Sequence, residues 1–228
     1  MIREHHLAVS RTARYYLLGS PGPTASQVWV VCHGYGQLAS RFLRDFEGLE
    51  SAGRLIVAPE ALSRFYLDSA KSGRHAETVG ASWMTREARE AEIEDYVRFL
   101  ELLKQQVLAI IGSPVPVGVL GFSQGVATAA RWVARSPEKP PLLVLWGSGL
   151  PAELVGPVGA QGFQRTRVVL VAGAKDAYFD PAAVEGQLDT LRGQGVSCER
   201  VTFPGGHRLD RETLSRVLAE LGEVGPAR

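Results

Sequence analysis

Short, continuous apolar runs recur along most of the chain, separated by segments in which apolar residues fall three or four positions apart. Continuous runs are typical of strands buried on both faces, and the wider spacing is typical of helices with one buried face. The runs that we interpret as strands lie at 28–31, 55–58, 117–120, 142–145 and 168–171, and a last short strand ends near Phe203.

The strongest helical pattern covers residues 86–111. We expect Thr85 to cap its start and Gly112 to end it. Asp180, which is followed by a proline, and Asp210 are typical N-cap residues of two further helices. The apolar residues that share one face of the 86–111 segment are Ile93, Tyr96, Val97, Leu100, Leu103 and Val107.

Weaker patterns lie near the N-terminus and after the second strand. Residues 7–10 and 14–18 predict two short strands around a polar turn, which would form an N-terminal antiparallel hairpin. A short helix is predicted to carry Phe42 and to end near Gly53. Residues 60–85 have no clear period. Because a loop of this length inside a compact domain is usually functional, we expect an irregular segment that forms a lid or a pocket wall.

Alternation of buried strands with helices defines the fold class. It predicts a mainly parallel central sheet with helices on both faces, that is, an α/β protein. A chain of 228 residues suits one domain, which we assign to 1–228. In such a sheet, functional groups lie beyond the carboxyl ends of the strands.

Composition excludes several classes of protein. Apolar residues make up 45% and charged residues 21% of the chain, and the net charge is +1. Lysine and arginine are scattered, so no nucleic-acid-binding patch is expected. Two cysteines predict no disulfide framework. Because no apolar run approaches the ~20 residues of a membrane span and the first residues lack a signal-peptide pattern, we expect a cytoplasmic protein without stable membrane insertion.

The third apolar run is followed by a motif that is typical of a catalytic nucleophile. Gly121–Gly125 reads G-F-S-Q-G and fits G-x-S-x-G, and small residues at helical spacing follow it. A strand, a tight turn and a helix are the context in which this motif exposes a nucleophilic serine. We interpret Ser123 as a nucleophile. The alternative is a serine that only caps a helix at a strand–helix turn.

An alcohol needs a base within hydrogen-bond reach to attack near neutral pH. His207 follows the last strand in a glycine turn and is the best candidate among the histidines. The imidazole needs an acid behind it, and Asp176 directly follows a buried strand. Asp180 competes for this role, but helix capping already explains it. The order Ser123, Asp176, His207 is that of α/β-hydrolases.

Acyl transfer also requires fixed N–H donors for the oxyanion. One candidate is the backbone N–H of Gln124, at the start of the helix. The other is the N–H of Tyr35, in the turn His33-Gly34-Tyr35-Gly36 after the first buried strand. We interpret His33 as a structural residue rather than a base.

With these residues assigned, the chain resembles the phospholipase/carboxylesterase family of α/β-hydrolases, which includes the acyl-protein thioesterases. The motif around Ser123 is the most specific part of the resemblance, which runs from about Val28 to the last helix. The resemblance implies an α/β-hydrolase fold and esterase or thioesterase activity with Ser123, Asp176 and His207 as triad. It implies no metal or organic cofactor, and no metal-binding motif occurs in the sequence.

Departures from the family pattern bear on the substrate. Val126 stands where a further glycine is common, and Gln37 stands where an acid is common. Tyr178 and Phe179 replace small aliphatic residues after the triad acid, and their rings would narrow the pocket. Substrate contacts are also expected from the aromatic and sulfur-containing residues of the irregular segment, with packing onto the core as the alternative. These residues are Phe65, Tyr66, Trp83 and Met84.

Three hypotheses follow. The first is a serine carboxylesterase that cleaves small-molecule esters of short- to medium-chain acids. The second is an acyl thioesterase or lysophospholipase, which the same groups would serve. The third is a hydrolase-fold binding protein without turnover, which predicts a missing or displaced triad residue.

Overall fold

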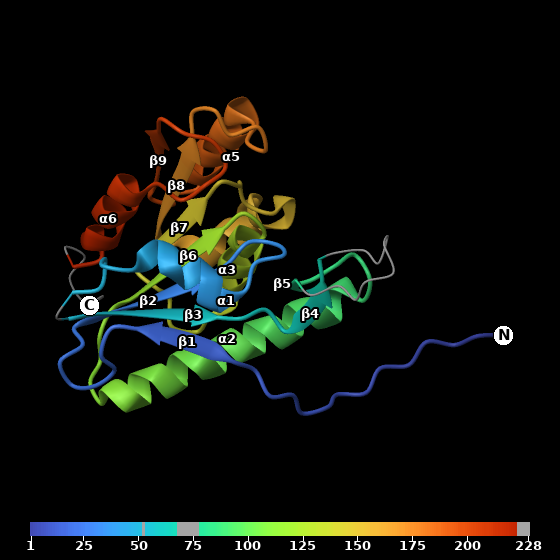
Figure 1. Cartoon of the computed structure of the whole chain (residues 1–228). Coiled ribbons are helices and arrows are strands. Elements are labelled where there is room, and N and C mark those ends of the chain that lie inside the picture. Colours follow the sequence, from blue (N-terminus) through green and yellow to red (C-terminus); the bar gives the residue numbers. More distant parts are fainter. Residues whose placement is uncertain (52, 68–77, 223–228) are drawn as a thin grey trace.

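The computed structural model describes residues 1–51, 53–67 and 78–222 (Figure 1). Seven strands in these ranges form one sheet, in the order β1-β3-β2-β6-β7-β8-β9. Neighbours pair in parallel except β1, which is antiparallel to β3. The mainly parallel sheet predicted from the sequence is confirmed. Its strands are β1 (Tyr15–Leu18), β2 (Gln27–Cys32), β3 (Arg54–Pro59), β6 (Val117–Phe122), β7 (Leu142–Trp146), β8 (Arg167–Gly173) and β9 (Cys198–Phe203).

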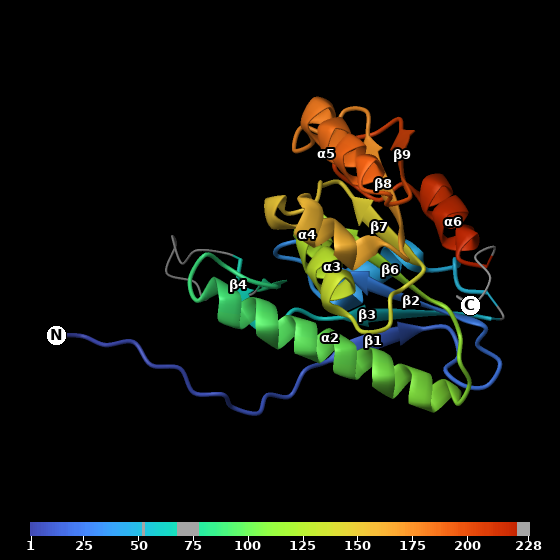
Figure 2. The ribbon, with the colours of Figure 1, turned by 180° about the vertical axis from the view of Figure 1, so that it is seen from behind.

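Helices cover both faces of this sheet. Helices α1 and α6 lie on the face seen in Figure 1, and α2, α3, α4 and α5 lie on the face seen from behind in Figure 2. No helix within the described ranges is long and apolar enough to cross a membrane. The α-helices are α1 (Ala39–Phe42), α2 (Arg89–Ile111), α3 (Gln124–Arg135), α4 (Pro157–Ala160), α5 (Pro181–Gly193) and α6 (Arg211–Glu220). Short 3₁₀ helices are η1 (Leu43–Phe46), η2 (Ala152–Leu154) and η3 (Gln161–Phe163).

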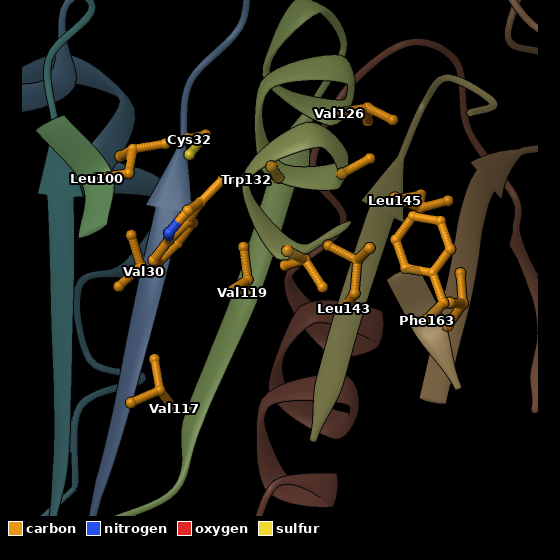
Figure 3. Close-up of a cluster of buried hydrophobic side chains, with 14 of the residues drawn as sticks. Val30, Cys32, Leu100, Val117, Val119, Val126, Trp132, Leu143, Leu145 and Phe163 are labelled. Carbon is orange, nitrogen blue, oxygen red and sulfur yellow. The ribbon is translucent and has the colours of Figure 1, made fainter. Parts of the chain in front are cut away.

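The two faces of the sheet explain the continuous apolar runs. Side chains alternate between the faces along each strand. On β2, Val30 and Cys32 join the core under α2 and α3, whereas Trp29 and Val31 join the core under α1 and α6. Figure 3 shows the first of these clusters, in which Trp132 of α3 lies against side chains of the central strands. Because both faces are covered by helices, consecutive positions on the strand are apolar.

Local capping chemistry starts and ends several helices as predicted. Asp180 accepts hydrogen bonds from the backbone N–H groups of Ala182 and Ala183 at the start of α5, and Asp210 caps α6 in the same way. Gly112 ends α2 in the left-handed conformation, at φ 76°. The prediction for Thr85 is wrong, because α2 begins later, at Arg89.

Thr85 is engaged in a turn instead of a cap. Its hydroxyl accepts a hydrogen bond from the N–H of Glu87, and its own N–H donates to the carboxylate of Glu92. These contacts hold residues 85–87 outside the helix. Ala88 then makes the entry to α2 in a left-handed conformation, at φ 47°.

The N-terminus differs from the predicted hairpin. An antiparallel pair is present, but β1 pairs with β3 and not with residues 7–10, which have no regular structure. The chain before β1 leaves the body of the molecule as an extended arm (Figures 1 and 2). Leu7 and Val9 are 86% and 76% exposed. Their apolar side chains therefore do not pack on a sheet, although their spacing is that of a strand.

Residues 60–85 contain more structure than the sequence predicted. Strands β4 (Ser63–Tyr66) and β5 (Val79–Ser82) form a separate two-stranded antiparallel sheet. Residues 68–77 of this segment lie outside the described residues. Each strand has only four residues, which is too short to establish a period-two pattern in the sequence.

Two glycines in different surroundings test the packing of this fold. A Cβ at Gly118, in β6, would lie 2.8 Å from Trp29 and 2.9 Å from Leu221. Gly118→Ala should therefore destabilise the protein by about 1–3 kcal/mol through overpacking. Gly186 lies inside α5 with no heavy atom near its missing side chain, so Gly186→Ala should stabilise by about 0.5–1 kcal/mol. Urea unfolding measures both, and shifts of the same sign would contradict the packing described here.

Candidate active site

Ser123 occupies a strained turn between β6 and α3. Its backbone has φ 53° and ψ −116°, a conformation that costs a non-glycine residue about 1–3 kcal/mol. The Ser123 N–H donates to the carbonyl of Trp146 at the end of β7, at 2.9 Å. Although Ser123 stands at the N-cap position of α3, its side chain makes no capping hydrogen bond. Helix capping therefore does not account for this serine.

The glycines on either side of Ser123 have a specific steric cause. A Cβ at Gly121 would lie 2.3 Å from the carbonyl oxygen of Gly125, and a Cβ at Gly125 would lie 2.2 Å from the carbonyl oxygen of Cys32. Real Cβ atoms do not approach backbone oxygens so closely. Only glycine at both positions allows α3 to turn back over β6 and against the end of β2.

His207 and Asp176 form a hydrogen-bonded pair. The distance between His207 Nδ1 and Asp176 Oδ2 is 2.8 Å, and the Asp176 side chain is only 1% exposed. The other carboxylate oxygen accepts the N–H of Tyr178 at 2.9 Å. When Nδ1 donates its proton to Asp176 Oδ2, Nε2 is the ring nitrogen left as an acceptor.

Backbone hydrogen bonds join the turns that carry this pair. After β8, the N–H of Lys175 donates to the carbonyl of Gly205 at 2.7 Å, and the N–H of Ala174 donates to that of Phe203. A Cβ at Gly173 would lie 2.4 Å from the Gly205 oxygen. The acid and the histidine therefore sit on two turns that are bonded to each other. Asp180, the competing acid, caps α5.

Ser123 and His207 both follow strands that end at the same edge of the sheet. The ring of Phe122, the residue before Ser123, lies 5.0 Å from the His207 ring between centroids. A Cβ at Gly147 would lie 3.0 Å from the His207 ring, so the imidazole packs directly on the backbone after β7. Within the described residues, no hydrogen bond joins the Ser123 hydroxyl to His207. Such bonds are often long in free enzymes and tighten with substrate.

The backbone N–H groups of Tyr35 and Gln124 are among those near Ser123 for which the described part of the chain provides no acceptor. Gln124 is the first residue of α3, where the helix supplies no acceptor. The turn that contains Tyr35 is closed by Gln37, whose side-chain oxygen accepts the N–H of Gly34 at 2.8 Å. A Cβ at Gly34 would lie 3.1 Å from the Phe122 ring, so this turn packs against the residue before Ser123.

His33 has a structural environment. It is fully buried. Its Nε2 accepts the N–H of Ala61 at 3.1 Å, and its Nδ1 lies 2.8 Å from the carbonyl oxygen of Gly34. Burial lowers the pKa of the His33 imidazole below its ordinary value. A neutral ring with both nitrogens engaged cannot serve as the base, as expected from the sequence.

Two of the expected substrate-contacting aromatic residues lie beside these groups. The Tyr178 ring lies 4.9 Å from the His207 ring between centroids, and the Phe65 ring lies 5.2 Å from the Tyr35 ring. Tyr178 is 82% exposed, so it stands at the surface next to the imidazole.

The other four expected residues are arranged differently. Trp83 is buried, and its indole N–H donates to the carbonyl of His33 at 2.8 Å. Met84 and Phe179 are partly buried and pack on the core beneath the sheet. Tyr66 is exposed on β4. Trp83, Met84 and Phe179 therefore attach their segments to the core.

Sequence analysis missed one part of this site, the side chain of Gln124. Its amide bonds to the segment that follows β5: Nε2 donates to the carbonyl of Met84 at 3.0 Å and to the Ser82 hydroxyl at 3.1 Å. Its Oε1 accepts the N–H of Trp83 at 3.2 Å. These partners lie about forty positions away in the sequence, so no local signal points to them.

The chain matches a known protein family. A model of the serine hydrolase family FSH1 matches residues 28–214, which include Ser123, Asp176 and His207. No curated protein matches the chain by sequence.

Solved structures share the fold at low sequence identity. Acyl-protein thioesterase 2 of Zea mays has a TM-score of 0.64 at 18% identity, over 93% of this chain and 99% of that one. A phospholipase/carboxylesterase of Dyadobacter fermentans has a TM-score of 0.65 at 17% identity, over 94% of this chain and 98% of that one. A carboxylesterase of Bacillus cereus has a TM-score of 0.66 at 13% identity, over 92% of this chain and 94% of that one. The α/β-hydrolase fold implied by the resemblance is confirmed.

The environment of His33 generates a prediction about pH. Its folded-state pKa is lowered, so the unfolded chain takes up a proton as the pH falls through about 6.5 while the folded chain does not. Stability that His33 contributes at neutral pH is therefore lost between about pH 6.5 and its lower folded-state pKa. Urea unfolding from pH 8 to pH 5 should show a steeper loss for the native protein than for His33→Gln. Parallel curves would contradict the buried, neutral imidazole.

Proposed function

The chain belongs to the serine hydrolase family FSH1, and from this premise we propose that it is a carboxylesterase acting on esters of short- to medium-chain acids. Two observations together carry the proposal. One is the Asp176–His207 hydrogen bond, and the other is the strained backbone of Ser123, whose side chain makes no capping hydrogen bond. A serine that only ended a strand would need neither a strained backbone nor a paired imidazole nearby.

In the proposed reaction, Ser123 Oγ attacks the ester carbonyl carbon while His207 Nε2 takes the hydroxyl proton. Asp176 accepts the Nδ1–H, which keeps Nε2 unprotonated and stabilises the imidazolium that forms. The 2.8 Å bond and the buried carboxylate suit this task. The tetrahedral intermediate collapses when His207 returns the proton to the leaving alcohol, which leaves an acyl group on Ser123.

Water completes the cycle by the same path. His207 removes a proton from a water molecule, which attacks the acyl-enzyme and releases the acid. In both halves the N–H groups of Gln124 and Tyr35 hold the oxyanion, and their lack of a protein acceptor supports this role. The reaction needs no metal or organic cofactor, because the nucleophile, base and oxyanion donors all come from the chain.

The aromatic residues at the site support the proposed substrate class. The Tyr178 ring stands against His207, and the Phe65 ring stands against Tyr35. Bulky rings beside the proposed base and the turn of Tyr35 would restrict the room for long acyl chains more than for short ones. The same machinery would cleave thioesters, the substrates named for the maize structural neighbour, so thioesters are the comparison substrates.

Removal of triad groups tests the mechanism. Ser123→Ala should lower kcat for p-nitrophenyl butyrate by about 10⁴–10⁶-fold, because it removes the attacking oxygen. Asp176→Asn should lower kcat by about 10⁴-fold, because an amide oxygen cannot stabilise the imidazolium as a carboxylate does. Circular dichroism checks that the fold persists. Unchanged turnover in Ser123→Ala would refute the proposal.

Asp180→Asn is the matched control for the acid. It makes the same chemical change four residues away, at a residue whose carboxylate caps α5. Asparagine is also a good N-cap residue, so turnover should stay within about twofold of the native protein. A loss comparable to that of Asp176→Asn would assign the acid to Asp180 instead.

Chain-length preference tests the role of Tyr178. Tyr178→Ala should raise kcat/KM for p-nitrophenyl octanoate relative to the acetate by about tenfold, since each buried methylene contributes about 0.8 kcal/mol. Tyr178→Phe keeps the ring and should keep the native profile. The same series with acyl-CoA thioesters separates ester from thioester preference. If Tyr178→Ala and the native protein share one profile, the ring does not limit the acyl group.

A further inference from the structure

The β4–β5 hairpin is bound directly to the turn that carries Tyr35. The N–H of Gly36 donates to the carbonyl of Ala81 at 2.9 Å, and the N–H of Ala81 donates to that of Gln37 at 3.2 Å. A Cβ at Gly80 would lie 2.4 Å from the Gly36 oxygen, so the two backbones are in contact. Because this turn carries the Tyr35 N–H, the position of β5 determines the position of one oxyanion donor.

The end of the same strand is bound to the other donor residue. Gln124 uses both ends of its side-chain amide on three consecutive residues: Nε2 reaches Ser82 and Met84, and Oε1 accepts the Trp83 N–H. Partners on both the nitrogen and the oxygen hold the amide in one orientation. The strand β5 is thereby fixed to the first residue of α3, whose backbone N–H is the second donor.

We propose that the Gln124 side chain is a positioning residue, which sets the spacing of the two oxyanion N–H groups by clamping the end of β5 to the nucleophile turn. This inference rests on the proposed function, because the two donors have a role only in acyl transfer. Oxyanion donors must match the transition state rather than the substrate. A change in their spacing should therefore lower kcat more than it changes KM.

Gln124→Met tests the clamp with the oxyanion donor intact, since any residue at this position supplies the backbone N–H. The variant keeps the length of the side chain and removes all three hydrogen bonds. We expect kcat per active site to fall about 10- to 100-fold, the size of effect that displacement of a catalytic group produces, with KM within about twofold. The Ki of butylboronic acid, which forms a tetrahedral adduct with the serine, should rise by the same factor as kcat falls.

Thr166→Val is the matched control. It removes a buried side-chain hydrogen bond to the carbonyl of Pro140, 2.8 Å long, just before the first residue of β8 and at the opposite edge of the sheet. It should lower the midpoint of urea unfolding but leave kcat per active site unchanged. Titration of both variants with a fluorophosphonate counts the active sites, so a partly unfolded preparation does not imitate a lower kcat.

If Gln124→Met does not fold, Ser82→Ala replaces it. This variant removes one of the three partners from the hairpin side, and we expect a smaller fall in kcat, about threefold, with unchanged KM. A kcat per active site equal to the native value, or a rise in KM alone, would overturn the clamp. If Ser123→Ala retains native turnover, the proposed function fails instead, so the two failures are distinguishable.

Discussion

The close approach of two backbones at Gly125 is the constraint on which the site depends. The helix α3 can begin immediately after β6 only because Gly125 lies against the carbonyl of Cys32, at the end of the neighbouring strand. That contact goes with a positive φ at Ser123, a strained conformation that a serine does not adopt by preference. The central parallel strands are buried on both faces, and their packing supplies the free energy that offsets the strain. The strained conformation of Ser123, which is partly buried, is therefore a consequence of core packing.

A second consequence of the parallel sheet is that distant residues converge without a long-range signal of their own. Every strand of β2, β6, β7, β8 and β9 ends at the same edge, so the turns that follow them are neighbours. The bonds between Lys175 and Gly205 and between Ala174 and Phe203 continue the β8–β9 ladder beyond the strands. Asp176 and His207 thus meet across an extension of the sheet, and the proposed pair is held by main-chain geometry rather than by flexible loops.

The predictions from the sequence succeeded where the physical cause is local or periodic. Buried strands produce continuous apolar runs, and Asp180 before a proline is a complete capping signal, so both could be read directly. The predictions failed where tertiary contacts decide. Thr85 has the chemistry of a cap, but Glu92 engages its N–H and moves the helix start. The pairing of β4 with β5, and the clamp by Gln124, depend on partners far away in the sequence.

Two departures from the expected family pattern, Val126 and Gln37, are accommodated by the structure around the proposed site. Val126 is completely buried and belongs to the core cluster under α2 and α3, so the larger residue is accommodated on the side of α3 away from solvent. Gln37 closes the turn with an amide oxygen, and a carboxylate could accept the same N–H.

The Gln37 amide holds the turn that contains Tyr35, one of the two proposed oxyanion donors, in place. Tyr178 differs in kind, because its exposed ring lies against the imidazole while its contact with Asp176 is made by the backbone N–H. A change of residue there alters the space offered to a substrate without moving the N–H groups or the Asp176–His207 pair. Under the proposed mechanism, packed backbone fixes the geometry of the reacting groups, and an exposed side chain such as Tyr178 sets the space offered to the substrate.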